Sequence, residues 1–174
     1  SHGMTRDSQQ MTEPSHGPWY YQQIELGFNY RITDLQAALG LSQLGKLDDF
    51  IARRRELAAR YEQLLTYLPL TLPSAQPDAE SAWHLYVVRL QAERISLSHR
   101  QVFEGLRAAG IGVNLHYIPV HLQPYYQALG FAEGDFPNAE RYYAEAISLP
   151  MFPLLTEEQQ DYVVEQLRRL LIEE

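Results

Sequence analysis

The chain has 174 residues, of which 45% are apolar and 21% charged, and its formal net charge is −8. This length allows one or two modest hydrophobic cores, and the composition is ordinary for a soluble globular protein. The acidic balance argues against nucleic-acid binding, because neutralising phosphates requires a basic face. No apolar run approaches the roughly 20 residues that span a bilayer, so we expect no membrane insertion.

The chain contains no cysteine and a single run of basic residues. The absence of cysteine removes disulfides, thiolate metal ligands and cysteine nucleophiles, and we expect a cytoplasmic protein. The basic run is Arg53, Arg54 and Arg55. We interpret it as a solvated helix face, because consecutive helical residues point in different directions and form no joint pocket.

The first 69 residues are predicted to hold a loop followed by two helices. Turn-forming residues are frequent over residues 5–18 and periodic apolar positions are few, which is typical of a surface loop. Thr33 is a good N-cap, and the apolar pattern after it predicts a helix that ends near Gly45. Apolar residues at three- and four-residue spacing then predict a long amphipathic helix over residues 47–68, which Pro69 stops.

The remainder of the chain alternates predicted strands with predicted helices. Aromatic and β-branched residues favour strands, and Ser98 and Gly110 mark the two ends of a helix. Thr156, with Gln159 in capping-box position, opens a final amphipathic helix. We expect strands over residues 83–90 and 112–115, and helices over residues 100–109, 124–129 and 138–147.

This order of elements predicts an α+β fold. We place a small α+β domain at residues 70–174, two linking helices at residues 33–69, and a loop segment at residues 1–32. A large apolar side chain contributes about 1.5–3 kcal/mol when it is fully buried. We therefore expect a surface outside the chain to cover the aromatic residues of the loop segment, which are Trp19, Tyr20, Tyr21, Phe28 and Tyr30.

The first candidate site lies directly ahead of the helix that begins near Thr33. Gly27 permits unusual backbone angles, and the Asn29 amide and the Arg31 guanidinium lie just outside a helix N-terminus. Such groups hold a phosphate or another anion. The alternative is a capped turn in which Arg31 pairs with a nearby carboxylate.

The second candidate site is the segment from His116 to His121, which leaves the predicted strand end at Leu115. Binding groups gather in loops after strands, and two imidazoles with the phenol of Tyr117 and a proline form a polar cluster. Hydrogen bonding to a substrate and a structural role for the histidines both stay open. Metal binding is the weakest of these hypotheses, because no cysteine accompanies the two histidines and their spacing differs from the helical His-Glu-x-x-His arrangement.

These two places also carry a resemblance to a known family. Residues Gly27–Ala38, followed by Leu41–Leu44, and the later His116–His121 resemble the C-terminal half of the DegT/DnrJ/EryC1/StrS sugar aminotransferases. The resemblance covers essentially the whole chain. Within the family, three further strings look closest to the pseudaminic-acid-pathway enzyme that aminates a UDP-linked 4-keto-6-deoxy-N-acetylhexosamine; they are Gln123–Tyr126, Gly134–Glu140 and Ser148–Pro150.

The resemblance implies the small C-terminal domain of a fold type I transferase that depends on pyridoxal 5'-phosphate, preceded by a long interdomain helix. It implies a homodimer with shared sites, with residues 1–32 left from the large domain and in contact with the other subunit. Asn29 would reach the cofactor phosphate of the partner subunit, supported by Tyr30 and Arg31. A UDP-sugar substrate would meet the second candidate site, and glutamate would be the usual amino donor. The residues implied to face the sugar are His116, Tyr117 and His121.

The chain departs from the family in its lysines. Transamination requires a lysine that forms a Schiff base with the cofactor, together with an acidic partner for the pyridine nitrogen. The only lysine is Lys46, at the junction of the two predicted helices, where the family has a structural position. We therefore expect a fragment that has no catalytic residue, binds no cofactor by itself and is inactive alone.

Two alternatives remain open. Residues Ser1–Met4 are either an expression scar or native sequence, and a likeness of Ser1–Asp7 to the region after the cofactor lysine favours native sequence. The competing function is a non-catalytic interaction or carbohydrate-binding module of the same fold, in which the aromatic N-terminal segment docks onto a partner protein.

Overall fold

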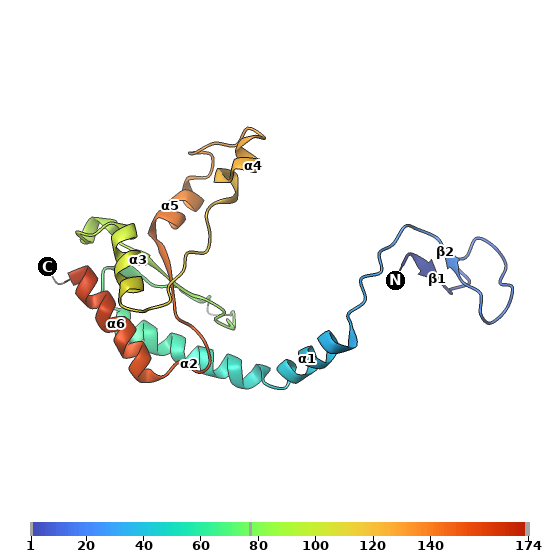
Figure 1. Cartoon of the computed structure of the whole chain (residues 1–174), viewed down its shortest axis with the longest axis horizontal. Coiled ribbons are helices and arrows are strands. Elements are labelled where there is room, and N and C mark those ends of the chain that lie inside the picture. Colours follow the sequence, from blue (N-terminus) through green and yellow to red (C-terminus); the bar gives the residue numbers. More distant parts are fainter. Residues whose placement is uncertain (1, 77, 173–174) are drawn as a thin grey trace. The chain divides into compact units, whose positions relative to one another are not determined.

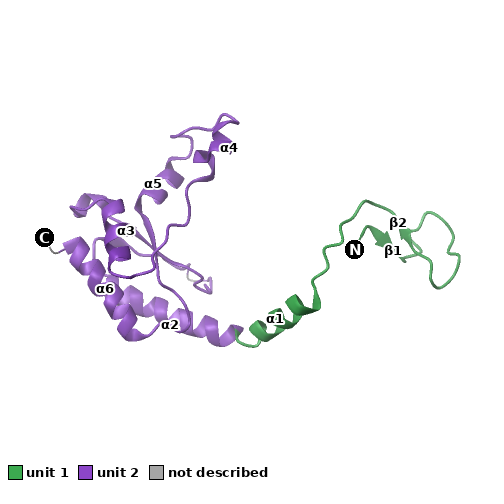
Figure 2. Cartoon of the chain, viewed as in Figure 1, with its two compact units in different colours: residues 1–46 green, residues 47–174 purple. Residues whose placement is uncertain are grey.

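A computed structural model describes residues 2–76 and 78–172, and the chain divides into two compact units (Figures 1 and 2). Unit 1 comprises residues 1–46 and unit 2 comprises residues 47–174. The division falls between the two predicted helices, whereas the sequence-based division kept both in residues 33–69. No helix within the described ranges combines the length and the apolar character that a bilayer crossing requires.

Unit 1 contains a small hairpin and one helix. Strands β1 (Met4–Thr5) and β2 (Gln22–Gln23) pair antiparallel. Helix α1 (Asp34–Leu44) begins after Thr33, whose hydroxyl accepts a hydrogen bond from the Gln36 backbone N–H, while the Gln36 side chain accepts one from the Thr33 N–H. This reciprocal cap satisfies two N–H groups that a helix start leaves without partners. The predicted helix and its N-cap are confirmed.

Most large apolar side chains of unit 1 are exposed. Helix α1 buries none of its residues. Trp19 is 71% exposed and Tyr30 is 86% exposed, and Tyr20 is half-buried. Where exposed apolar side chains form a contiguous patch, they mark interaction sites in soluble proteins.

Unit 2 is built on a three-stranded antiparallel sheet in the order β3-β4-β5. Helix α2 (Leu47–Leu65) precedes the sheet, and its residues Leu57, Ala58, Tyr61 and Leu65 are buried. The strands are β3 (Leu70–Thr71), β4 (Tyr86–Leu90) and β5 (Ala146–Leu149). The other helices are η1 (Ala92–Arg94), α3 (His99–Ala108), η2 (Val120–Leu122), α4 (Pro124–Gln127), α5 (Pro137–Glu145) and α6 (Glu157–Ile172). The predicted α+β class is confirmed.

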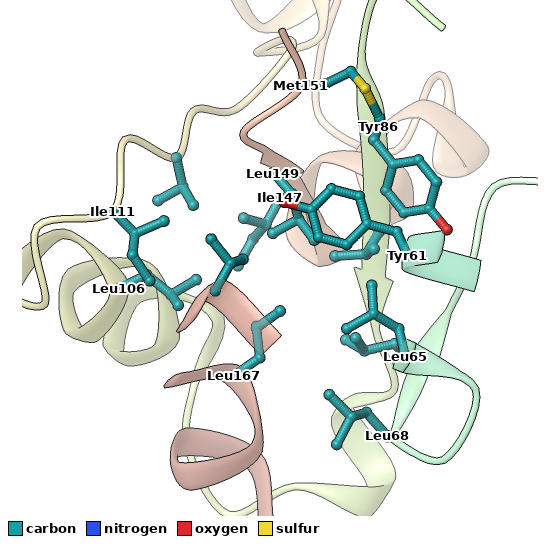
Figure 3. Close-up of a cluster of buried hydrophobic side chains, with 14 of the residues drawn as sticks. Tyr61, Leu65, Leu68, Tyr86, Leu106, Ile111, Ile147, Leu149, Met151 and Leu167 are labelled. Atoms are coloured by element: carbon teal, nitrogen blue, oxygen red, sulfur yellow. The ribbon is translucent and has the colours of Figure 1, made fainter. Parts of the chain in front are cut away.

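The core of unit 2 lies between the sheet and helices α2, α3 and α6 (Figure 3). Residues of β4 alternate between buried and half-buried, so Tyr86, Val88 and Leu90 face the core. The Tyr86 ring lies 5.0 Å from the Tyr61 ring of α2, measured between ring centroids. Leu106 of α3 and the apolar face of α6 complete the cluster. The strand predicted over residues 83–90 is therefore confirmed for residues 86–90, where the alternation corresponds to burial of one face.

Capping motifs place the other long helices as predicted. Ser98 and Gln101 form a capping box at the start of α3, and Thr156 and Gln159 exchange the same pair of hydrogen bonds at the start of α6. These local signals depend on residues within one turn, which is why the sequence identifies them.

One predicted element is wrong and one strand was not predicted. The helix expected over residues 138–147 is present as α5, but it ends at Glu145, and Ala146 begins the unpredicted strand β5. All four β5 residues are buried, so the strand lacks the alternating pattern that identifies a half-exposed strand. The predicted strand over residues 112–115 is reduced to one bridge, in which Asn114 pairs antiparallel with Ser148.

The interpretation of the three arginines as a solvated helix face is wrong for Arg53 and Arg54, which are half-buried, whereas Arg55 is exposed. The Nη1 group of Arg54 lies 3.0–3.1 Å from the carbonyl oxygens of Trp83, His84 and Met151. Arg53 Nη2 donates to the Leu155 carbonyl at 2.9 Å. The side chains reach carbonyls distant in sequence, so they join α2 to the segments before β4 and after β5.

We expect Arg54→Ala to lower the free energy of unfolding by about 1.5–3 kcal/mol, because hydrogen bonds to a charged donor are lost and half-buried carbonyls lose a partner. Urea unfolding of the chain measures this change. The matched control is Arg100→Ala, since Arg100 is 85% exposed and pairs with Glu104 one helical turn away. The control should change stability much less, and equal effects would contradict the cross-linking role of Arg54.

Candidate functional site

The N-terminal candidate residues lie just before α1 in unit 1. Arg31 Nε donates a hydrogen bond to Asn29 Oδ1 at 3.1 Å, and the Phe28 and Tyr30 rings stack 5.0 Å apart. All four side chains are exposed. Within the described ranges no carboxylate pairs with Arg31, so its charge is not neutralised as the capped-turn alternative supposed. The segment therefore presents a guanidinium and an amide close to a helix N-terminus, which suits an anion.

One cavity of unit 2 has a volume of about 630 Å³. Its walls come from the segment between α3 and η2, from β5 and the loop after it, and from the first turns of α6. Most of the lining is apolar. The lining residues that have polar side chains are Asn114, His116, Ser148, Glu158, Gln159 and Tyr162.

His116 is fixed in this cavity by β5. Its Nδ1 atom lies 2.8 Å from the Oγ atom of Ser148. Ser148 is 4% exposed, and its backbone exchanges two hydrogen bonds with Asn114. The bridge therefore brings the segment carrying His116 alongside β5, and the hydroxyl then holds the imidazole.

The rim of the cavity carries a phenol and a carboxylate from α6. Tyr162 donates to the Ala109 carbonyl at 3.0 Å, which ties α6 to the end of α3. Hydrogen bonds from its own backbone N–H and from the Thr156 hydroxyl hold the pKa of Glu158 below the usual glutamate value. Glu158 therefore contributes negative charge at the helix start, where it interacts favourably with the positive end of the helix dipole.

His121 lines a different cavity, of about 360 Å³, formed with aromatic residues near α4 and α5. It is 7% exposed, and its Nε2 atom lies 2.7 Å from Glu140 Oε1. Because an ionised carboxylate only accepts, Nε2 of His121 donates. Glu140 also accepts from the backbone N–H groups of Gly134 and Phe136. The His121 hydrogen bond first, and these backbone bonds after it, lower the pKa of Glu140.

The predicted trio is thus divided between two places. His116 and His121 line separate cavities, and Tyr117 is 73% exposed and lines neither of the two. The Tyr117 ring lies edge-on to the His116 ring, with centroids 4.7 Å apart. Within residues 2–76 and 78–172, no group of three or more histidine, aspartate or glutamate side chains could hold a metal ion.

Sequence reasoning did not identify the partners of the two histidines. Ser148 follows His116 by 32 residues and Glu140 follows His121 by 19. Neither spacing corresponds to a turn of helix or a strand repeat. Only the pairing of distant segments brings these groups together.

Residues 1–168 match the DegT/DnrJ/EryC1/StrS aminotransferase family. The chain belongs to this family. Over 173 residues it is 39% identical to the spore coat polysaccharide biosynthesis protein SpsC of Bacillus subtilis, covering 98% of this chain and 44% of that protein.

Two solved structures resemble this chain in fold. Spr1654 of Streptococcus pneumoniae in its apo-form is 28% identical with a TM-score of 0.80, covering 97% of this chain and 40% of the other. PseC of Helicobacter pylori, an aminotransferase of pseudoaminic acid biosynthesis, is 26% identical with a TM-score of 0.80, covering 98% and 43%. Spr1654 is also known in PLP- and PMP-forms.

This chain spans less than half the length of the relatives that it matches. The match to one part of fold type I sugar aminotransferases confirms the predicted fold and family. The roles of the individual site residues remain predictions.

We expect Glu140→Gln to destabilise the chain at neutral pH and to do so less in acid. The folded-state pKa of Glu140 is depressed below the ordinary value of 4.5, so its stabilisation is present above that value and is lost as the pH falls through the folded pKa. Urea unfolding at neutral pH and below pH 4.5 measures the difference. Glu93→Gln, at an exposed carboxylate of η1, is the control. A Glu140→Gln effect that did not shrink in acid would contradict this account.

Proposed function

We propose that this chain supplies the small C-terminal domain and adjoining segment of a sugar aminotransferase that transfers an amino group from glutamate to a UDP-linked 4-keto-6-deoxy sugar. The observation that carries the proposal is that His116, in one of the segments that resemble the family, lines the 630 Å³ cavity of unit 2. A volume of about 630 Å³ lies within the usual size of small-molecule sites, about 300–1,000 Å³.

The polar groups of this cavity suit a sugar. Asn114, His116 and Tyr162 offer an amide, an imidazole and a phenol at its surface, and such groups fix the orientation of a hydroxylated ligand in a mostly apolar site. Tyr117 and His121 are proposed to act around the same substrate, although neither lines this cavity. The nearness of the Tyr117 ring to His116 supports its inclusion.

The N-terminal segment suits the phosphate of pyridoxal 5'-phosphate. Asn29 and Arg31 supply an amide and a guanidinium that no carboxylate of the described residues neutralises, and Tyr30 stacks beside them on Phe28. In the proposed homodimer Asn29 reaches the cofactor phosphate of the other subunit. The cofactor supplies the electron sink that amino transfer requires.

The lysine that carries the cofactor is proposed to come from a large domain. Lys46, the only lysine among the 174 residues, lies in the turn between α1 and α2 and is exposed. The large domain and the second subunit would cover the exposed apolar residues of unit 1, including Trp19 and Leu35. We infer that the chain by itself does not catalyse amino transfer.

A transamination assay tests this proposal. Glutamate, pyridoxal 5'-phosphate and a UDP-4-keto-6-deoxy-N-acetylhexosamine are supplied to this chain, and to the protein obtained when the upstream coding frame is also read. We expect amino transfer only in the longer protein. Activity in the short chain would contradict the role assigned to the missing lysine, and activity in neither would favour the interaction-module alternative.

We expect Asn29→Ala and Arg31→Ala each to weaken cofactor binding by the longer protein about tenfold, which corresponds to about 1.4 kcal/mol. Both changes remove a donor to the phosphate. Titration of cofactor absorbance measures the dissociation constant. Arg6→Ala, at an exposed arginine of the same unit, serves as the control and should leave this constant unchanged. If Arg6→Ala weakened cofactor binding equally, the effect of Arg31→Ala would reflect only the change in net charge.

A further inference from the structure

The Ser148 hydroxyl has one hydrogen-bond partner within the part of the chain that the structure describes. It lies on β5, the residue is 4% exposed, and among the described residues its only side-chain contact of this kind is His116 Nδ1 at 2.8 Å. The backbone N–H and carbonyl of Ser148 are both committed to Asn114. A buried hydroxyl hydrogen without an acceptor is costly, since the desolvation of the donor is then not compensated.

This geometry distinguishes the two neutral forms of the imidazole. If Nδ1 carried the proton, it would donate to Ser148 Oγ, and the hydroxyl hydrogen would have no acceptor among the described residues. If Nδ1 is unprotonated, the hydroxyl donates to it and both groups are satisfied. In that form the proton of the imidazole resides on Nε2.

We propose that Ser148 is a positioning residue that holds His116 with Nδ1 unprotonated and Nε2–H available to the 630 Å³ cavity as a hydrogen-bond donor. The ligand atom that meets His116 is then an acceptor, such as a hydroxyl, carbonyl or phosphoryl oxygen of a nucleotide sugar. His116 in this form binds and orients, and it does not abstract a proton through Nε2. The identity of the ligand rests on the proposed function, whereas the state of the ring does not.

The chain contains an internal reference for this assignment. His99 Nε2 lies 2.9 Å from the Ala146 carbonyl oxygen. A carbonyl only accepts, so neutral His99 must carry its proton on Nε2. The ring-nitrogen signals of His99 therefore give the pattern expected for a neutral imidazole protonated at Nε2, measured in the same sample as His116.

The experiment is two-dimensional NMR that correlates the imidazole nitrogens with the ring carbon-bound protons, on the ¹⁵N-labelled 174-residue chain. The spectra are recorded above the ordinary histidine pKa of about 6.5, where neutral rings dominate. The His116 signals are identified by their loss in His116→Gln. We expect the His116 pattern to match that of His99, with Nδ1 as the unprotonated nitrogen.

Two serine variants test the role of the hydroxyl. In Ser148→Ala the two nitrogen signals of His116 should move toward each other, because the form protonated at Nδ1 gains population once no hydroxyl donates to that atom. Ser148→Thr keeps a hydroxyl and should restore the original pattern, while the His99 signals stay constant in both variants.

Either of two results would overturn the proposal. The first is a wild-type His116 protonated at Nδ1, which needs no variant and is decisive even if Ser148→Ala fails to fold. The second is a His116 pattern that is unchanged in a folded Ser148→Ala. Both readouts are independent of amino transfer, so their failure is distinguishable from failure of the proposed function in the transamination assay.

Discussion

The pairing of β5 with its neighbours on both edges is the constraint on which the rest of unit 2 depends. On one edge β5 forms the ladder with β4, from Tyr86 opposite Leu149 to Arg89 opposite Ala146. On the other edge Ser148 bridges Asn114. All four β5 residues are buried, so the strand can shift its register only by moving apolar side chains out of the core. The strand that organises the sheet therefore also forms part of the wall of the cavity lined by His116.

The loop that follows β5 is held by side chains of α2. Tyr61 donates its phenol hydrogen to the Pro150 carbonyl, and Arg54 and Arg53 donate to the Met151 and Leu155 carbonyls. Burial, followed by the nearby Tyr86, raises the pKa of Tyr61, so this phenol remains a donor over the whole physiological range. A loop has few backbone partners of its own, and these donors replace the ladder that ends at Leu149. The cavity is thus shaped by polar contacts as much as by apolar packing.

The two histidines show how one sequence motif serves two structural purposes. His116 faces a cavity with polar groups and is held by a neutral hydroxyl, while His121 is buried against a carboxylate that also closes the turn over residues 134–136. The first arrangement leaves a ring nitrogen for a ligand in the proposed aminotransferase. The second satisfies a polar group inside a largely aromatic cavity, as buried polar groups require.

Signals that lie within a few residues of one another could be predicted from the sequence. They are the N-caps at Thr33, Ser98 and Thr156, the alternation along β4, and the motifs that resemble the family. Strand β5, the carbonyl contacts of Arg54 and the pairing of His116 with Ser148 became evident only from the folded chain. Each depends on segments far apart in the chain. A strand buried on both faces also lacks the alternating pattern from which a strand is predicted.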